Sequence, residues 1–188
     1  MEAYNWIIIA SWAVFLVYWG FAAFGVKKDT RKPRVHGWLW RFVLLGAIVM
    51  VVAYFPSTKH FFEWRLIMVR PLAGWSAAAC SVVGIGIAVW ARVYLGSDWS
   101  SHPDVKEGHK LVTSGPYAFV RHPIYTGMLL ALVGSVLISN AFGSVVAFIA
   151  AVVLLARIPV EERYMRELFP DAYRAYAART KRLVPFVW

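Results

Sequence analysis

Long hydrophobic runs dominate the pattern of this sequence, and short polar segments between them hold nearly all of its charged residues. The runs are residues 4–24, 38–55, 71–91 and 123–156, and their single charge is Arg41, near the start of the second. A transmembrane helix needs about 20 predominantly apolar residues to cross a hydrocarbon core of roughly 30 Å. Each run therefore predicts at least one membrane-crossing helix.

The last run, residues 123–156, is too long for one crossing. A single helix of 34 residues would extend for about 51 Å. The sequence Ser-Asn-Ala-Phe-Gly at 139–143 is a turn signal in its middle. We therefore expect two helices, 124–138 and 142–156, that form a tight hairpin. Both are short for full spans, so we expect them to tilt or to cross a thinned region.

The third run, residues 71–91, is rich in small side chains, including Gly74, Gly84 and Gly86. Small residues let transmembrane helices approach each other closely, so we expect close helix contacts at these glycines. The fold class that follows is an all-α integral membrane protein with about five transmembrane helices. Its C-terminal hairpin is followed by an amphipathic basic tail, residues 157–188, which we expect Pro159, Pro170 and Pro185 to break.

Composition supports the membrane class. The chain is 60% hydrophobic and 16% charged, whereas soluble domains carry about a quarter charged residues. The net charge of +10 could suggest nucleic acid as a partner. However, the basic residues flank the apolar runs, where anionic lipid headgroups attract them, so membrane lipids are the expected partners and nucleic acid is not. The single cysteine, Cys80, cannot form an internal disulfide.

The distribution of Lys and Arg predicts the orientation in the membrane. With five crossings, 17 of the 20 basic residues fall on one side, and only Lys59, Arg65 and Arg70 fall on the other. Cytoplasmic loops carry the excess of Lys and Arg, so we expect a multi-pass protein with its N-terminus outside and its C-terminus in the cytoplasm. Three polar segments, 108–117, 120–127 and 157–162, would then share the cytoplasmic side, and the hairpin would bring the last two together.

Those segments carry a family resemblance. The motifs are His109-Lys110-Leu111-Val112-Thr113-Ser114-Gly115-Pro116-Tyr117, then Arg121-His122-Pro123-x-Tyr125-x-Gly127, then Glu161-Glu162, with Phe169-Pro170-Asp171-x-Tyr173-x-x-Tyr176 and Arg182-Leu183-x-Pro185-Phe186 beyond them. In this order they resemble the isoprenylcysteine carboxyl methyltransferase family, over about residues 99–188. Related phospholipid N-methyltransferases share the Arg-His-Pro and Glu-Glu parts. Pro170 stands where the family usually has glycine.

The resemblance implies S-adenosyl-L-methionine as cofactor and a carboxylate on a lipid-like or prenylated acceptor as substrate. It implies a methyltransferase catalytic region at 96–188 that forms one integrated domain with the N-terminal transmembrane helices, 1–95. The cofactor-binding positions that it implies are His109, Lys110, Leu111, Val112, Tyr117, His122, Pro123, Ile124, Tyr125 and Glu162. Glu162 would take the cofactor ammonium, and the aromatic side chains would enclose the adenine and ribose.

The catalytic candidates are Arg157, Arg121 and Glu161. A carboxylate acceptor is already a nucleophile and needs a cation such as Arg157 or Arg121 to orient it. The alternative, N-methylation of a phospholipid headgroup, needs a general base, for which Glu161 is available. A non-catalytic transporter or scaffold is the alternative from another class. It is disfavoured because the expected spans hold no ionisable side chain at mid-membrane.

Plainer structural roles for the same residues remain open. Arg121 and Arg157 could be interface anchors, Glu161 and Glu162 could begin a helix after Pro159, and Tyr173 with Tyr176 could lie in an interfacial belt. A metal site from His102, His109 and His122 lacks ligand spacing, so we expect no metal. No required protein partner is evident.

Overall fold

The computed structural model describes residues 2–24, 71–96 and 111–185, and every regular element in these ranges is a helix. The helices are α1 (Ala3–Phe24), α4 (Pro71–Leu95), the 3-10 helix η3 (Gly115–Ala118), α5 (Pro123–Ile138), α6 (Ala141–Leu168) and α7 (Pro170–Arg179). Three of them, α1, α4 and α6, are long and apolar enough to cross a membrane, and α5 is a shorter apolar helix. The all-helical membrane class is confirmed, while the expected spanning helix at 38–55 lies outside the described residues.

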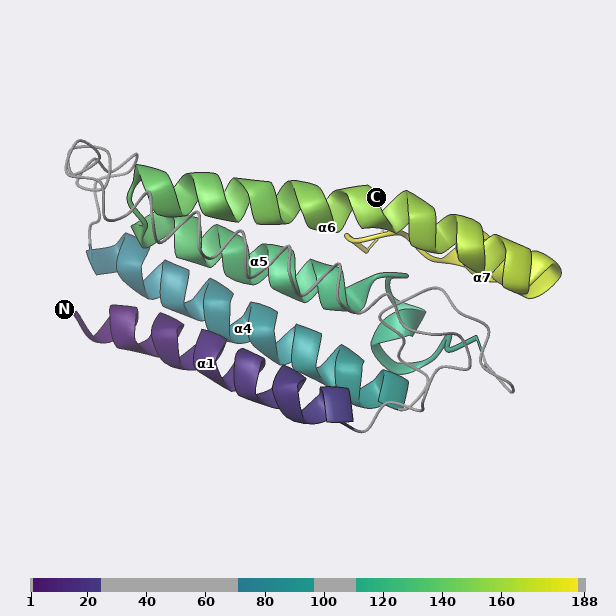
Figure 1. Cartoon of the computed structure of the whole chain (residues 1–188), viewed down its shortest axis with the longest axis horizontal. Coiled ribbons are helices and arrows are strands. Elements are labelled where there is room, and N and C mark those ends of the chain that lie inside the picture. The colour runs from purple at the N-terminus through teal and green to yellow at the C-terminus, as the bar shows by residue number, and fades with distance from the viewer. Residues whose placement is uncertain (1, 25–70, 97–110, 186–188) are drawn as a thin grey trace.

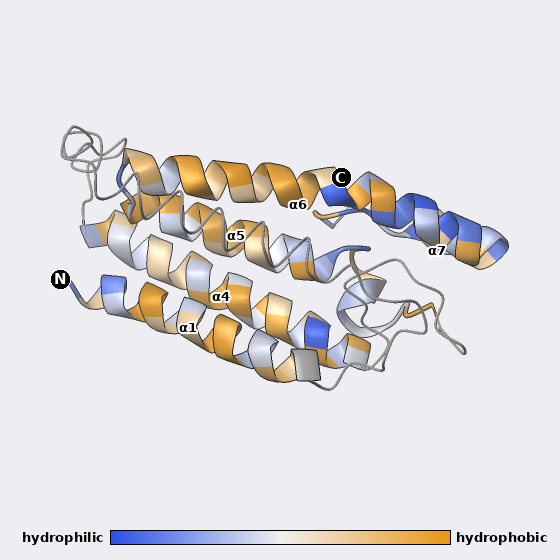
Figure 2. Ribbon diagram, viewed as in Figure 1, coloured by the Kyte–Doolittle hydropathy of each residue, from blue (hydrophilic) through white to orange (hydrophobic). Residues whose placement is uncertain are grey.

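The four apolar helices lie side by side in the order α1, α4, α5, α6 (Figure 1). Helices α1, α4 and α6 run in one direction and α5 runs in the other, so one end of the bundle gathers Phe24, Leu95 and Pro123 next to η3 and α7. Figure 2 shows that the hydrophilic residues concentrate at this end. Every Arg and Lys among the described residues belongs to it, as the predicted charge asymmetry requires. We call it the polar end.

Small residues allow α4 and α5 to pack with their backbones close together. A Cβ atom added to Gly84 would lie 2.5 Å from the carbonyl oxygen of Gly127, and one added to Gly127 would lie 2.6 Å from the backbone nitrogen of Ala88. Gly74 lies similarly close to the Tyr4 ring of α1. The expected close contacts are therefore found at Gly74 and Gly84. The expectation was wrong for Gly86, which faces open space.

Arg92 joins the ends of α1 and α4. Its side chain donates one hydrogen bond of 2.7 Å to the carbonyl oxygen of Gly96 and one of 3.1 Å to that of Ala22. Cations are favourable at helix C-termini, where backbone carbonyls lack intrahelical partners. This explains why α4 continues to Leu95 beyond the expected end at residue 91, with Arg92 only 5% exposed.

The predicted hairpin of α5 and α6 is confirmed. Only Ser139 and Asn140 separate the two helices, and the Asn140 side chain caps α6 by accepting a 2.9 Å hydrogen bond from the backbone N–H of Gly143. Helix α5, with 16 residues, is about 24 Å long and short for a full span. The prediction for the second arm was wrong, because α6 has 28 residues and continues well past Ala156.

Pro159 lies inside α6 and does not end it, contrary to the expected break. A proline removes one backbone hydrogen bond, but packing around it can outweigh that loss. Here the residues on both sides are fixed, since Ile158 is 2% exposed and Glu162 is 1% exposed. Glu161 and Glu162 consequently lie within a long helix and not at the start of a new one. Pro170, by contrast, begins α7.

Candidate active site

The C-terminal segment 180–183 returns to the start of α5 and pairs with it through the backbone. The N–H of Arg121 donates to the carbonyl oxygen of Lys181 at 2.8 Å, and the N–H of His122 donates to that of Arg182 at 3.0 Å. The hydroxyl of Thr126 adds a 2.7 Å hydrogen bond to the Leu183 carbonyl. Two segments nearly 60 residues apart in sequence therefore form one surface at the polar end.

A hydrogen bond between two buried tyrosines, Tyr176 of α7 and Tyr117 of η3, holds these helices together. The Tyr176 hydroxyl donates a 2.7 Å hydrogen bond to the carbonyl oxygen of Tyr117. Burial raises the pKa of Tyr176 to about 12, so this hydroxyl keeps its proton at neutral pH. Tyr173 and Tyr176 are each 3% exposed, and the interfacial-belt interpretation is therefore wrong for both.

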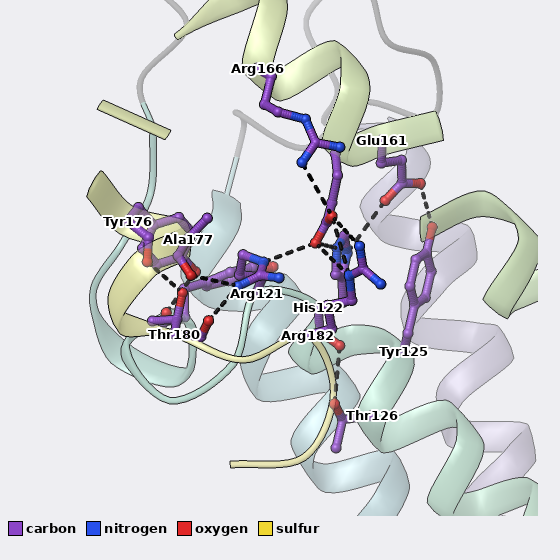
Figure 3. A network of polar contacts seen from close by, with 12 residues as sticks. Arg121, His122, Tyr125, Thr126, Glu161, Arg166, Tyr176, Ala177, Thr180 and Arg182 are labelled. Atoms are coloured by element: carbon purple, nitrogen blue, oxygen red, sulfur yellow. Dashed lines mark hydrogen bonds and ion pairs between the residues drawn. The ribbon is translucent and has the colours of Figure 1, made fainter. Parts of the chain in front are cut away.

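Glu162 is the centre of the polar contacts. Its Oε1 accepts a 2.9 Å hydrogen bond from Nε of Arg121, and its Oε2 accepts one of 3.1 Å from Nη2 of Arg182. Nη1 of Arg166 and Nε2 of His122 lie at 3.8 and 3.7 Å from its oxygens. We call Arg121, His122, Glu162, Arg166 and Arg182 the Glu162 cluster (Figure 3). A carboxylate buried this deeply needs such partners, because an unpaired buried charge is very costly.

Arg121 connects the Glu162 cluster to the end of α7. Besides bonding Glu162, it donates through Nη1 to the carbonyl oxygens of Ala177, at 3.1 Å, and of Thr180. Its side chain is 11% exposed. These contacts give Arg121 three acceptors from two different segments, which is the environment of a residue that holds elements together.

A second group of contacts surrounds Glu161, one residue away on α6. The Tyr125 hydroxyl donates a hydrogen bond to its Oε1, and Nη2 of Arg157 lies 3.3 Å from the same oxygen. The His122 ring stacks on the Tyr125 ring with a centroid distance of 5.6 Å and an interplanar angle of 7°. Nδ1 of His122 is 3.7 Å from Oε2 of Glu161. His122 thus lies between the two carboxylates.

The structure brings six of the expected site residues together, and they are Arg121, His122, Tyr125, Arg157, Glu161 and Glu162. Pro123 is buried and Ile124 half-buried in the first turn of α5, next to His122. Tyr117 is buried and connects to α7. Leu111 and Val112 are half-buried ahead of η3, and His109 and Lys110 lie outside the described residues.

Two members of the Glu162 cluster were not among the expected site residues. Arg166 is an i,i+4 neighbour of Glu162, at 3.8 Å and with its side chain 54% exposed. Arg182 is the more important omission, because it makes three hydrogen bonds to Glu162. The only signal for it in the sequence was its place in the last motif, Arg182 to Phe186. In the described part of the chain, no group of three His, Cys, Asp or Glu residues could hold a metal ion.

Fold and site together define a membrane-embedded helical protein with a charged cluster at one end of the bundle. Residues 77–167 match the model of the isoprenylcysteine carboxyl methyltransferase (ICMT) family. This match covers just under half of the chain and confirms the resemblance stated from the sequence. The matched segment includes α5 and most of α6, and with them Arg121, His122, Glu161 and Glu162.

Individual relatives match to different extents. The chain is 44% identical over 85 residues to protein-S-isoprenylcysteine O-methyltransferase B of Arabidopsis thaliana, which covers 44% of this chain and 43% of that protein. It is 26% identical over 187 residues to methanethiol S-methyltransferase 1 of Bradyrhizobium diazoefficiens, covering 88% of this chain and 64% of that protein. The matches with the plant proteins thus span less than half of their length.

The fold also resembles a solved structure. The eukaryotic intramembrane Ras methyltransferase ICMT matches with a TM-score of 0.56 at 21% sequence identity, over 78% of this chain and 53% of that one. At this level of identity, the likeness establishes a shared fold.

Proposed function

We propose that this protein is an S-adenosyl-L-methionine-dependent membrane methyltransferase that O-methylates a carboxylate on a lipid-like acceptor, such as an isoprenylated cysteine. We further propose that its active site faces the cytoplasm. One observation carries the proposal. The Arg-His-Pro-x-Tyr motif at the start of α5 and the Glu-Glu motif of α6 are the parts by which the sequence resembles the family, and they contact each other at the polar end.

The residues present fit the chemical groups of the cofactor. Glu162 and Glu161 offer carboxylates for an ammonium, and the parallel rings of His122 and Tyr125 offer flat surfaces for an adenine. Nε2 of His122 is buried and has no hydrogen-bond partner among the described residues, so a ligand could provide one. When bound, the cofactor would supply a methyl group already activated on a sulfonium.

Arg157 is the better of the two arginine candidates for orienting an acceptor carboxylate. Its side chain is 44% exposed, and it lies one turn before Glu161 on α6, nearer the apolar part of the helix from which a lipid-borne acceptor would arrive. Arg121 already has three acceptors within the protein and is only 11% exposed. A carboxylate needs no base, so positioning and exclusion of water are the main tasks of these side chains.

The contacts of Glu161 argue against the N-methyltransferase alternative. An ammonium or a thiol acceptor must lose a proton before it can attack, and Glu161 is the candidate base. Its carboxylate already accepts a hydrogen bond from Tyr125 and lies beside the Arg157 guanidinium. Both contacts are made to Oε1 of the charged carboxylate, and both would weaken if Glu161 took up a proton.

A transfer assay with three acceptors tests the proposal. The purified protein in lipid nanodiscs would be given cofactor with a radiolabelled methyl group and N-acetyl-S-farnesylcysteine, phosphatidylethanolamine or methanethiol. We expect label on the farnesylcysteine as a base-labile methyl ester. Base-stable label on the amine or the thiol would reject O-methylation, and absence of both binding and transfer would reject the methyltransferase class.

A further inference from the structure

Among the residues that the structure describes, the charged groups that contact Glu162 are basic side chains. Its carboxylate is 1% exposed and is hydrogen-bonded by Arg121 from the start of α5 and by Arg182 from the C-terminal segment. The proposed function requires the same carboxylate to bind the ammonium of the cofactor. Both oxygens already accept hydrogen bonds from arginines, so the ammonium would have to compete with an arginine for its position beside Glu162.

We propose that the Arg182 side chain occupies the position of the cofactor ammonium and that the two cations exchange on Glu162 when the cofactor binds. This inference rests on the proposed function. In this role Arg182 does not bind the cofactor. Its side chain competes with the cofactor ammonium for Glu162 and keeps the carboxylate in position until the cofactor arrives. The charge next to Glu162 is then the same before and after exchange, so the buried carboxylate is never left without a cation.

Arg182 is the partner that can leave. Arg121 would have to give up the carbonyl oxygens of Ala177 and Thr180 as well as Glu162, and it is 11% exposed. The Arg182 side chain is 37% exposed, so water can solvate it once it moves away. Arg166 is more exposed still, but at 3.8 Å it makes no hydrogen bond that the ammonium would have to replace.

The exchange requires no movement of the backbone. Segment 180–183 is held to the start of α5 by the backbone bonds from Arg121 and His122 and by the Thr126 hydroxyl. None of these bonds uses the Arg182 guanidinium. Rotation of one long side chain would therefore open the position beside Glu162 while the segment stays in place.

The effect of removing Arg182 on cofactor affinity tests this inference. Affinity should rise if Arg182 competes with the cofactor, and should fall if Arg182 helps to bind it. The probe is S-adenosylhomocysteine, which carries the same ammonium, measured by isothermal titration with the full chain in nanodiscs. Removing a competitor raises apparent affinity, so Arg182→Gln should bind at least about threefold more tightly than wild type. Arg182→Lys, which keeps the charge, should bind less tightly than Arg182→Gln. Arg174→Gln, an exposed arginine of α7, makes the same charge change and should match wild type.

A double-mutant cycle with Glu162→Gln completes the test. Without the carboxylate there is nothing to compete for, so adding Arg182→Gln to Glu162→Gln should leave the affinity unchanged. Unchanged or weaker binding by folded Arg182→Gln would overturn the exchange, as would tightening that persists beside Glu162→Gln. If Arg182→Gln does not fold, the affinity of Arg182→Lys decides. Lysine cannot reproduce the three hydrogen bonds of the arginine and should compete less, so a value equal to or weaker than wild type would overturn the exchange. If wild type itself binds no S-adenosylhomocysteine, the cofactor proposal fails, and the inference fails with it.

Discussion

Arg121 and Glu162 are 41 positions apart in the sequence and meet through a 2.9 Å hydrogen bond at the polar end of the bundle. Arg121 precedes the first arm of the hairpin, and Glu162 lies near the C-terminal end of the second. The pair therefore closes the hairpin at the end opposite its turn. Because Arg121 also bonds the end of α7, the same contact holds the C-terminal segment in place.

The first prediction follows from the burial of this pair. Arg121→Gln should lower the free energy of unfolding by about 3 kcal/mol, since breaking a buried ion pair leaves a charge poorly compensated. Denaturant unfolding of the purified protein would measure the loss, and proteolysis near residues 180–183 should increase. Arg163→Gln, at an exposed arginine next to Glu162 in sequence, is the control and should change stability little. Equal stability of the two variants would contradict the structural role of Arg121.

The hairpin could be predicted because its signals are local. An uncharged run of 34 residues exceeds one crossing, and Asn140 lies where a helix cap is needed. Because the motifs of Arg121 and Glu162 lie at the open ends of its two arms, the hairpin alone predicts that they meet. The continuation through Pro159 could not be predicted this way, because it depends on the packing of Ile158 and on cations that reach Glu162 from elsewhere in the chain.

The second prediction concerns two glycines of α4 that differ in surroundings. Gly84→Ala should destabilise the protein by about 1–3 kcal/mol, because the new methyl would lie 2.5 Å from the Gly127 carbonyl oxygen and force α4 and α5 apart. Gly86→Ala adds the same methyl into open space and should leave stability unchanged or slightly raised, since alanine favours helix. Unfolding in denaturing detergent would compare them. A Gly86 variant as unstable as the Gly84 variant would refute the close packing as the cause.

Arg182 shows where sequence reasoning about the site stopped. Its motif, residues 182–186, is visible in the sequence, but this position near the C-terminus has no hydrophobic period or turn signal that would place it against α6. Its contact with Glu162 depends on α7 turning back and on the backbone pairing of segments 120–122 and 181–182. Pairing of this kind is non-local, and a single sequence does not reveal it.

The third prediction tests the membrane orientation. Reporter fusions after Lys32 and after Trp188 should report the cytoplasm, and a fusion after Ser57 should report the opposite side, because 17 of the 20 basic residues fall on the first side. The C-terminal ends of α1, α4 and α6 lie at one end of the bundle, as this orientation needs. A C-terminal reporter on the non-cytoplasmic side would overturn the orientation and the cytoplasmic site together.

The last prediction concerns Arg157, for which an interface anchor and an acceptor-orienting residue behave differently on substitution by lysine. Arg157 lies 3.3 Å from Glu161 and is 44% exposed, so lysine can keep the charge and the contact with Glu161. As an anchor, Arg157→Lys would retain stability and full activity. As the group that orients the acceptor, Arg157 needs its planar fork, which forms two parallel hydrogen bonds with a carboxylate and which lysine cannot reproduce.

We therefore expect Arg157→Lys to keep cofactor binding and the unfolding temperature of wild type but to lose methyl transfer roughly tenfold or more, about 1.4 kcal/mol of transition-state stabilisation. Steady-state kcat/KM with N-acetyl-S-farnesylcysteine would measure the loss, and isothermal titration with S-adenosylhomocysteine would show that binding is intact. Arg163→Lys, on the same helix and exposed, is the matched control and should retain full activity. Wild-type turnover by the Arg157 variant would reject its role with the acceptor and return it to the class of interface anchors.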